Sequence, residues 1–211
     1  MRKILLFAAG AAFLAISVPI SAGAQDGRVA GSENMFISPC GEPFFAEKKE
    51  AYPVVKWFNG ADANHDGKLD IDEMRNDAAR FFKVLDRNGD GMIDSQEVTF
   101  YETRIVPQIL TSPTSALETG FIRVVMQESH IKPDEPSSGL DTQQGASYYS
   151  LFHEPEPVRS ADRNFDYRIS LTEFLAHSDR HFKALDFNNQ GYLTLAQLPK
   201  TEAERQAKAH R

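Results

Sequence analysis

The sequence predicts a mainly α-helical protein, built from two repeated pairs of helix–loop–helix units packed together, with a long irregular connection between the pairs. Two acidic twelve-residue segments lie close together at 62–73 and 86–97, and related segments follow one hundred residues later at 162–173 and 186–197. Similarity at a fixed period indicates a duplicated structural unit. The residues between paired segments carry one apolar stripe at helical spacing. We number these segments loops one to four in chain order.

Loops one and two carry the residue types that hold a hard cation. Each has Asp first, Asn third, Asp fifth, Gly sixth, Asp ninth and Glu twelfth. Ca²⁺ takes about six to eight oxygen ligands, and a curled loop supplies them from alternate positions and from both oxygens of the final Glu. Gly at position six permits the sharp turn because it lacks a Cβ atom. Leu69 and Ile93, at position eight, are expected to enter the core while their backbone pairs with a partner loop.

This spacing matches the loop motif of the EF hand, and the chain resembles a four-hand protein of the EF-hand superfamily over roughly residues 53–106 and 157–199. The resemblance implies Ca²⁺ as the cofactor, with backbone carbonyl groups as ligands at position seven. The implied metal ligands are Asp62, Asn64, Asp66, Lys68, Asp70 and Glu73 in loop one, Asp86, Asn88, Asp90, Met92, Asp94 and Glu97 in loop two, and Asp162, Asn164, Asp166, Arg168, Ser170 and Glu173 in loop three. Loops one and two each have four acidic side chains at ligand positions, so we expect both to bind calcium at neutral pH.

Loops three and four depart from the motif to different degrees. Loop three has Tyr167 where the motif has Gly, and a bulky side chain in a left-handed conformation costs roughly 1–2 kcal/mol. Loop four has Gln190, Thr194 and Gln197 at positions five, nine and twelve, which leaves one carboxylate, Asp186, among its ligand positions. We therefore expect loop four to be structural and paired with a working loop. The sequence predicts two calcium sites and leaves a third, weaker one open.

Only twelve residues, 74–85, separate loops one and two, which leaves room for one helix. Its apolar stripe follows a spacing of three, four, four and three residues through Ile71, Met74, Ala78, Phe82 and Leu85. A straight helix of this length holds the two loops about 18 Å apart, too far for their strands to pair. If helices 71–85 and 171–185 pack antiparallel, loop one meets loop four and loop two meets loop three. A kink near 76–79 is the alternative and would pair adjacent loops.

Residues 1–24 have the features of an export signal. Arg2 and Lys3 give a positive start, residues 4–20 an apolar run, and residues 22–24 a small-residue cleavage site. The alternative is a transmembrane anchor, but the run is short for a bilayer and contains a glycine and a proline. We predict cleavage, export to the periplasm or the medium, and no stable membrane insertion afterwards.

The rest of the chain divides into five parts by composition and spacing. We expect an irregular N-terminal segment at 25–52, loop pair one at 53–106, a connecting segment at 107–156, loop pair two at 157–200 and a charged tail at 201–211. The stretch 111–157 is rich in Ser, Thr, Pro and Gly, and long irregular loops in compact domains usually have a role. It is our first candidate for binding a protein of the cell envelope. We expect the tail to be a solvated helix without a function.

Charge and cysteine content limit the function classes. The formal net charge is −7, and it becomes −9 without residues 1–24 because Arg2 and Lys3 leave with them. A chain this acidic has no electrostatic footprint for nucleic acid, and cation binding is the simplest use of the carboxylates. The lone Cys40 cannot form an internal disulfide. A free thiol or an intermolecular bridge is open, and we favour a small buried residue.

Other chemistry has weaker support in the sequence. His177 and His181 are four residues apart on one predicted helix, a spacing that suits a transition metal, but no third ligand is evident. We favour a solvated or helix-capping pair. Glu154 and Glu156 lie between prolines and suggest a restrained acidic turn. Because no nucleophile–base set is visible, we predict a non-enzymatic, exported calcium-binding protein, either a buffer, a sensor or a calcium-braced scaffold. The alternative is a calcium-dependent partner-binding module that uses the stretch 111–157.

Overall fold

The computed structural model describes residues 33–110 and 145–209. The predicted export signal and the greater part of the candidate partner-binding stretch, residues 111–144, lie outside these ranges. Among the described helices, none combines the length and the apolar character needed to cross a membrane. Helices dominate over strands in both ranges, in agreement with the mainly α fold class.

The helices of the described ranges are α1 (Val54–Ala61), α2 (Ile71–Leu85), α3 (Ser95–Phe100), α5 (Leu171–Leu185) and α6 (Glu202–Ala209). The described strands pair as β1 (Glu33–Ile37) with β2 (Pro43–Glu47), β3 (Leu69–Asp70) with β6 (Tyr192–Leu193), and β4 (Met92–Ile93) with β5 (Ile169–Ser170), all antiparallel. A π-helix at Tyr101–Ile105 continues α3, and short 3₁₀ helices cover Pro107–Ile109, Gly145–Tyr148 and Arg159–Ala161. Helix α2 and strands β3 and β4 recur one hundred residues later as α5, β5 and β6, whereas a short 3₁₀ turn stands in place of α1 and no helix of the described second half corresponds to α3.

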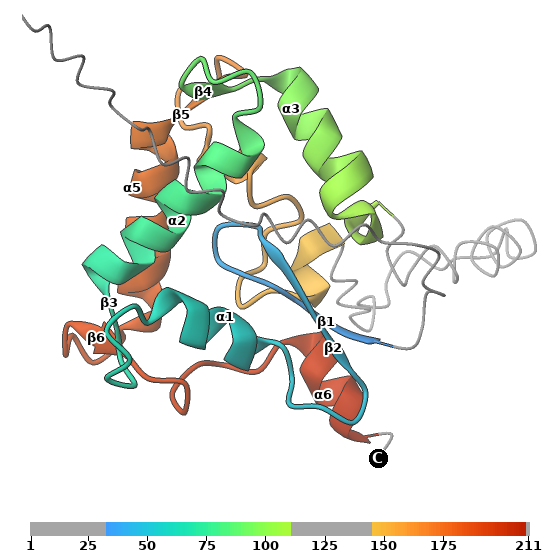
Figure 1. Cartoon of the computed structure of the whole chain (residues 1–211), viewed down its shortest axis with the longest axis vertical. Coiled ribbons are helices and arrows are strands. Elements are labelled where there is room, and N and C mark those ends of the chain that lie inside the picture. The colour runs from blue at the N-terminus through green and yellow to red at the C-terminus, as the bar shows by residue number, and fades with distance from the viewer. Residues whose placement is uncertain (1–32, 111–144, 210–211) are drawn as a thin grey trace, which may run out of the picture. The chain divides into compact units, whose positions relative to one another are not determined.

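Helices α2 and α5 lie side by side (Figure 1). Each begins with a capping box, in which the N-cap side chain and the Glu three residues later satisfy each other's backbone N–H groups. Across the pair, Arg75 donates two hydrogen bonds to Asp179, at 2.7 and 2.8 Å. The hydroxyl of Ser178 donates to the carbonyl of Met74 at 3.4 Å. Helix α2 runs without interruption from 71 to 85, so the kinked alternative is wrong.

The loops pair between the halves of the chain, as the helix length predicted. Leu69 of loop one lies opposite Leu193 of loop four, and Ile93 of loop two lies opposite Ile169 of loop three. Figure 1 shows these two strand pairs at opposite ends of α2 and α5, which makes the two helices antiparallel. All four position-eight side chains are buried. Each end of the helix pair therefore carries one loop from each half.

The expectation of an irregular segment at 25–52 is wrong for its second part, because β1 and β2 form an antiparallel hairpin. Met35, Phe36 and Ile37 of β1 are all buried, so the strand lacks the alternation that marks a one-sided strand in sequence. At the turn, Gly41 has φ +95°, and a Cβ atom there would lie 2.9 Å from the Tyr101 hydroxyl. The hydroxyl of Tyr101 donates to the Gly41 carbonyl at 2.7 Å. The hairpin is thus part of the core.

Two apolar cores lie under the two loop pairs, and β1 contributes to both. The core below loops two and three contains Ile93, Ile169 and the edge-to-face pair Phe82 and Phe174, with ring centroids 5.7 Å apart. It also takes Met35 and Ile37. The core below loops one and four takes Phe36 instead, together with the side chains Trp57, Leu69, Met74, Phe182 and Leu193. Successive strand residues point to opposite faces, so β1 joins the two cores.

The C-terminal helix α6 corrects a second expectation. The charged tail at 201–211 was predicted to be solvated, but Thr201 and Glu204 are buried. The Thr201 hydroxyl caps the backbone N–H of Glu204 at 3.0 Å and lies 2.8 Å from the hydroxyl of Tyr52. Tyr52 also donates to the carbonyl of Met35, which ties the start of α6 to the hairpin. Composition misled here because long charged side chains can cover apolar surface while their charged ends stay in water.

Candidate metal sites

Loop one curls so that its first residue sits at the centre of a set of backbone donors. The carboxylate of Asp62 accepts from the N–H of Asp66 at 3.2 Å and from that of Gly67 at 2.9 Å. Glu73 closes the loop from the other side, because its Oε1 accepts from Ala63 at 3.1 Å and its Oε2 from Asp70 at 3.0 Å. Both carboxylates are largely buried, with 4% and 8% of the residue surface exposed. The loop thus directs its first and twelfth side chains inward.

Loop two repeats this geometry closely. Asp86 accepts from the N–H of Asp90 at 3.1 Å and from that of Gly91 at 2.9 Å. Glu97 accepts through Oε1 from Arg87 at 2.8 Å and through Oε2 from Asp94 at 3.0 Å. Position six is left-handed in both loops, with φ +78° in loop one and +81° in loop two, which glycine adopts at no steric cost. The two loops therefore present the same all-oxygen donor set, which suits a hard cation such as Ca²⁺.

Loop three keeps the backbone path of loop one without its glycine. Tyr167 stands at φ +65°, a conformation that an L-residue with a side chain adopts at a cost. Its N–H still donates to Asp162 at 3.0 Å, as that of Gly67 does to Asp62. Hydrogen bonds from Ser170 hold the pKa of Glu173 below its ordinary value. The ligand residues are therefore in place, and the strain at position six separates loop three from loops one and two.

Loop four closes through its own amide groups. The Nε2 of Gln190 donates to Oε1 of Gln197 at 2.7 Å and to the carbonyl of Tyr192 at 2.8 Å. The hydroxyl of Thr194 donates to the same Oε1 at 3.0 Å. These contacts join positions five, seven, nine and twelve, the positions that meet at the cation in a working loop. The geometry supports the interpretation that loop four is structural.

An ion pair also connects loops two and three. Arg168 Nη2 lies 3.3 Å from Oδ2 of Asp90, which is the ligand residue at position five of loop two. Both side chains are about half exposed, so solvent screens this pair and it contributes little to stability. It places the side chain at position seven of loop three beside a ligand residue of loop two.

Comparison with known protein families agrees with this geometry. A family model of the EF hand matches residues 54–76 and 78–99, which include α1, α2 and the start of α3. Residues 54–76 and 78–99 are thereby assigned to the EF-hand superfamily. The matched EF hands contain loops one and two, whereas loops three and four lie outside the matched residues. A search of curated proteins found no match to the chain.

The histidine pair of α5 is not solvated, so that expectation is wrong. His177 and His181 have only 3% and 5% of their surface exposed. The carboxylate of Glu154 lies between them, with Oε2 3.1 Å from Nε2 of His177 and Oε1 3.1 Å from Nε2 of His181. The ligand atoms of the three side chains all lie within 4.8 Å of one another. Sequence spacing missed this cluster because Glu154 comes from an irregular segment that has no periodic signal.

Charge in this cluster is unevenly distributed. Burial on its own would raise the pKa of Glu154, but its contacts with the imidazoles of His177 and His181 outweigh burial and lower the pKa to about 2. Burial lowers the pKa of His177 and favours its neutral form. Two residues further on, burial raises the pKa of Glu156 to about 7. The two glutamates of the predicted acidic turn therefore have opposite preferences, and Glu154 is a carboxylate at neutral pH.

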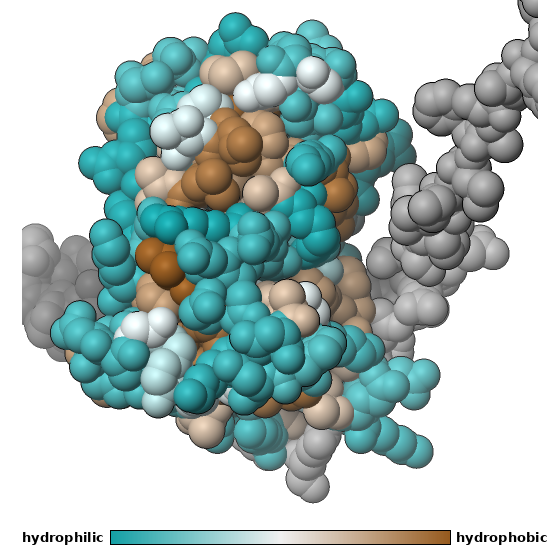
Figure 2. All heavy atoms as spheres, turned by 60° about the vertical axis from the view of Figure 1, so that its left-hand side comes forward, coloured by the Kyte–Doolittle hydropathy of each residue, from teal (hydrophilic) through white to brown (hydrophobic). Residues whose placement is uncertain are grey.

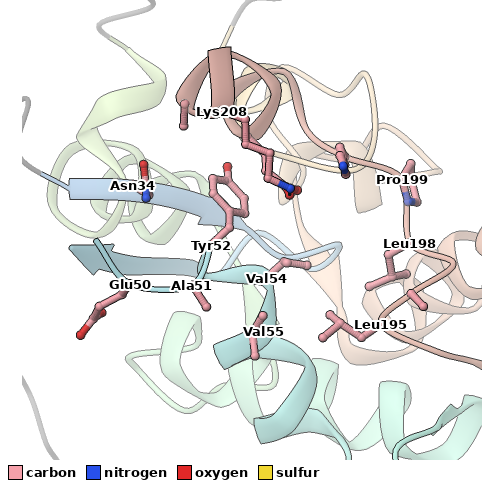
Figure 3. Close-up of a pocket in the computed structure, with 14 residues that line it drawn as sticks. Asn34, Glu50, Ala51, Tyr52, Val54, Val55, Leu195, Leu198, Pro199 and Lys208 are labelled. Atoms are coloured by element: carbon pink, nitrogen blue, oxygen red, sulfur yellow. The ribbon is translucent and has the colours of Figure 1, made fainter. Parts of the chain in front are cut away.

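The remaining candidates for chemistry are a cysteine and a pocket. Cys40 is buried, as expected, and burial raises the pKa of its thiol far above the ordinary value, so the reactive thiolate is disfavoured. A pocket of about 430 Å³ lies between the hairpin, α1, residues 195–200 and α6 (Figure 3). Its described lining contains apolar side chains together with Tyr52, Glu204 and Lys208, and neither histidine nor cysteine. No nucleophile–base pair gathers there.

Exposed aromatic side chains distinguish loops three and four from the EF hands of the first half. Phe165, Tyr167 and Phe187 are each at least 73% exposed. The equivalent positions in loops one and two hold His65, Gly67 and Arg87. Most of the molecular face turned forward in Figure 2 is hydrophilic, and hydrophobic side chains gather in a smaller area of its upper half.

Proposed function

We propose that this chain is an exported, non-enzymatic calcium-binding protein in which Ca²⁺ orders the EF-hand loops and fastens the two halves together. Export rests on the signal features of residues 1–24. The observation that carries the proposal is the pairing of β3 with β6 and of β4 with β5, since each strand pair joins a loop of one half to a loop of the other. An ion that orders loop one or loop two thereby also positions a strand that the second half needs.

We call this joining of the two halves by bound Ca²⁺ the calcium clamp. Its stabilising energy is electrostatic. Four acidic side chains at the ligand positions of loop one repel one another, and a divalent ion removes that repulsion. An ion that binds only the folded chain stabilises it by about 2.7 kcal/mol when its free concentration is about 100 times the Kd. For a protein outside the cytoplasm, where calcium is abundant, moderate affinity is enough. We assign loops one and two to stronger binding than loop three, and loop four to supporting loop one.

Thermal unfolding of the chain from residue 25 onward, with Ca²⁺ and with a chelator, tests the proposal. We expect a higher midpoint with Ca²⁺ and a smaller rise for Glu73→Gln, because a neutral amide cannot replace the bidentate carboxylate. Isothermal titration should find two or three sites in the parent chain and one fewer in this variant. Gln197→Ala in loop four serves as the control and should leave the number of sites unchanged. A midpoint that does not depend on calcium would contradict the clamp.

A second function is supported by the ends of the undescribed stretch. Ile109 and Ala146 flank residues 111–144, and both belong to the core under loops two and three. Calcium at loop two would therefore stabilise the base from which this stretch leaves the fold. We propose that it binds a protein of the cell envelope when calcium is present. Pull-down from an envelope extract should capture the same partner with the parent chain plus Ca²⁺, and lose it with chelator or after deletion of 113–142. Capture that ignores both changes would exclude this role.

A further inference from the structure

Two separate parts of the chain build the Glu154–His177–His181 cluster. The two histidines lie one turn apart on α5. Glu154 belongs to a loop that closes on itself, because the N–H of Ala146 donates to the carbonyl of Pro155 at 2.8 Å. Gly145 permits this closure, since a Cβ atom there would lie 2.3 Å from the Pro155 oxygen. The carboxylate is therefore held in front of the helix by backbone geometry.

The hydrogen bonds of His181 require a cation beside its Nε2 atom. Its Nδ1 lies 2.9 Å from the carbonyl oxygen of Pro39, and a carbonyl only accepts, so Nδ1 carries a hydrogen. In neutral imidazole Nε2 then holds a lone pair, and this lone pair faces the carboxylate of Glu154 at 3.1 Å. Two acceptors at this distance repel each other unless a proton or a metal ion lies between them. A histidine that binds a metal typically donates its other N–H to a carbonyl group, as His181 does to Pro39.

From this geometry we propose that Glu154, His177 and His181 form a site for a transition-metal ion of the Zn²⁺ type, separate from the calcium loops. Two imidazole nitrogens and one carboxylate oxygen suit Zn²⁺, whereas Ca²⁺ prefers oxygen ligands alone. Ligand atoms about 2.0–2.2 Å from a tetrahedral ion lie about 3.3–3.5 Å apart, close to the 3.1 Å separations found here.

The surroundings of the cluster fit an ion site with access from one side. The side chain of Glu154 is 28% exposed, while those of His177 and His181 are 3% and 6% exposed. An ion can therefore enter past the carboxylate. The half-buried ring of Phe152 stacks on His181, with centroids 3.8 Å apart and planes at 12°. This apolar wall fixes the ring orientation, and three protein ligands leave a fourth position for water.

The hydrogen bond between Arg180 and His177 affects how strongly the cluster can bind a metal ion. Its Nη2 donates to Nδ1 of His177 at 2.9 Å, and arginine only donates, so Nε2 of His177 carries the hydrogen in this state. Metal binding through Nε2 requires this hydrogen to leave that nitrogen and Arg180 to release Nδ1. Arg180 therefore competes with the metal. Arg180→Met should strengthen Zn²⁺ binding by about five-fold, the size of one net hydrogen bond.

The test uses the chain from residue 25 onward, saturated with Ca²⁺ so that the EF-hand loops are filled. Titration with Zn²⁺ should show one saturable site, and Co²⁺ should give visible d–d absorption of low coordination number. His181→Gln and Glu154→Gln should each weaken Zn²⁺ binding by more than about 100-fold, because outer-shell partners alone contribute about 10–100-fold. Glu156→Gln, two residues away from the ligand, is the matched control and should bind Zn²⁺ as the parent does.

Two results would overturn the site. One is the absence of saturable Zn²⁺ binding by the calcium-loaded parent chain, which would leave a protonated His181 as the cation in the cluster. The other is unchanged binding in His181→Gln. A readout without any variant guards against misfolding: nitrogen NMR of the parent chain should show the Nε2 resonances of His177 and His181 shifting on addition of Zn²⁺, and unshifted resonances would exclude the site. Calcium titration of each variant confirms that the EF-hand loops remain intact.

Discussion

Helices α2 and α5 occupy equivalent places in the two halves, but the buried side chains on one face of each helix make different contacts. In α2 the buried carboxylate of Asp77 accepts from Nε1 of Trp57 at 3.0 Å. Phe81, four residues later, packs edge to face against Tyr101, with ring centroids 6.3 Å apart. One turn of α2 thus contributes a hydrogen-bonded carboxylate and an aromatic ring to the core.

The equivalent positions of α5 hold His177 and His181, and both turn to Glu154 instead of to the apolar cores. The backbone of the two helices is alike, with fifteen residues and a capping box in each. Two side-chain differences on one face of the helix therefore replace contacts within the core by a candidate metal site. A duplicated frame can keep its packing while one face acquires another chemistry.

The loops differ in a complementary way. Loops one and two have all the motif ligands, whereas loop three carries strain at position six and loop four closes through amides. Because loop one pairs with loop four and loop two with loop three, each end of the molecule combines a complete loop with a weaker one. In the proposed function, calcium in the first half therefore acts on both ends.

The largest expected effect comes from equivalent phenylalanines that lie in different cores. Phe82 belongs to the core under loops two and three, and Phe182 to the core under loops one and four. Replacing either by Ala should reduce the free energy of unfolding by about 3–5 kcal/mol. Denaturant unfolding measures that loss, and isothermal titration should show that Phe82→Ala weakens loop two and Phe182→Ala weakens loop one. If both variants weakened the same loop, the assignment of one core to each loop pair would be wrong.

Restoring loop four would remove the main difference between the halves. Gln190→Asp with Gln197→Glu gives it the carboxylates that loop three has, and Gly191 already stands at position six with φ +82°. We expect one additional calcium site with a Kd below about 1 mM, worth about 4 kcal/mol. The neutral control is Gln190→Asn with Gln197 left unchanged. An unchanged stoichiometry in the acidic variant would show that more than ligand chemistry separates this loop from the others.

The segments that precede loops one and three carry opposite charges at equivalent positions, with Lys56 in the first half and Glu156 in the second. Burial raises the folded-state pKa of Glu156 to about 7, above an unfolded value of about 4.3, so its contribution favours folding below the unfolded pKa and is lost as the pH rises through 7. Glu156→Gln should therefore be more stable than the parent at pH 8 by about 1–3 kcal/mol, with no difference near pH 4. Unfolding midpoints across this range measure it. Lys56→Gln, at the equivalent exposed position, should show no such pH dependence, and an effect as large there would point to a general charge effect.

The smallest expected change concerns position six of loops one and three. Tyr167→Gly should tighten calcium binding at loop three by about tenfold, because it removes roughly 1–2 kcal/mol of left-handed strain. The reverse change, Gly67→Tyr, should weaken loop one by a similar factor, since a Cβ atom at Gly67 meets no atom within 4 Å and strain alone is added. Site-resolved calcium titration by NMR distinguishes the two loops. Equal affinities in Tyr167→Gly and the parent would mean that strain does not limit loop three.

Local patterns predicted the elements with strong periodic signals. The ligand spacing placed loops one to four, and the twelve residues 74–85 predicted both the single helix and the pairing between halves. The hairpin at 33–47 was not predicted, because β1 is buried on both faces and its sequence does not alternate between apolar and polar residues. Helix α6 was expected in solvent because composition does not report which side of a charged helix is covered.

The candidate transition-metal cluster required tertiary structure. His177 and His181 were visible as a helical pair, but their partner Glu154 lies 23 and 27 residues away in an irregular loop. Its position depends on the closure at Gly145 and on the contact of His181 with Pro39 of the hairpin turn. No single-segment pattern contains these contacts.

Hydrogen exchange at β6 tests the central claim most directly, since this strand belongs to loop four and has no complete ligand set of its own. Adding Ca²⁺ to the chain should slow amide exchange at Tyr192 and Leu193, because calcium in loop one orders β3 and hence its partner strand. Glu73→Gln should abolish this protection, and Glu97→Gln in loop two should leave it in place. Exchange at β6 that is indifferent to calcium, or protection that survives Glu73→Gln, would contradict a calcium clamp between the two halves.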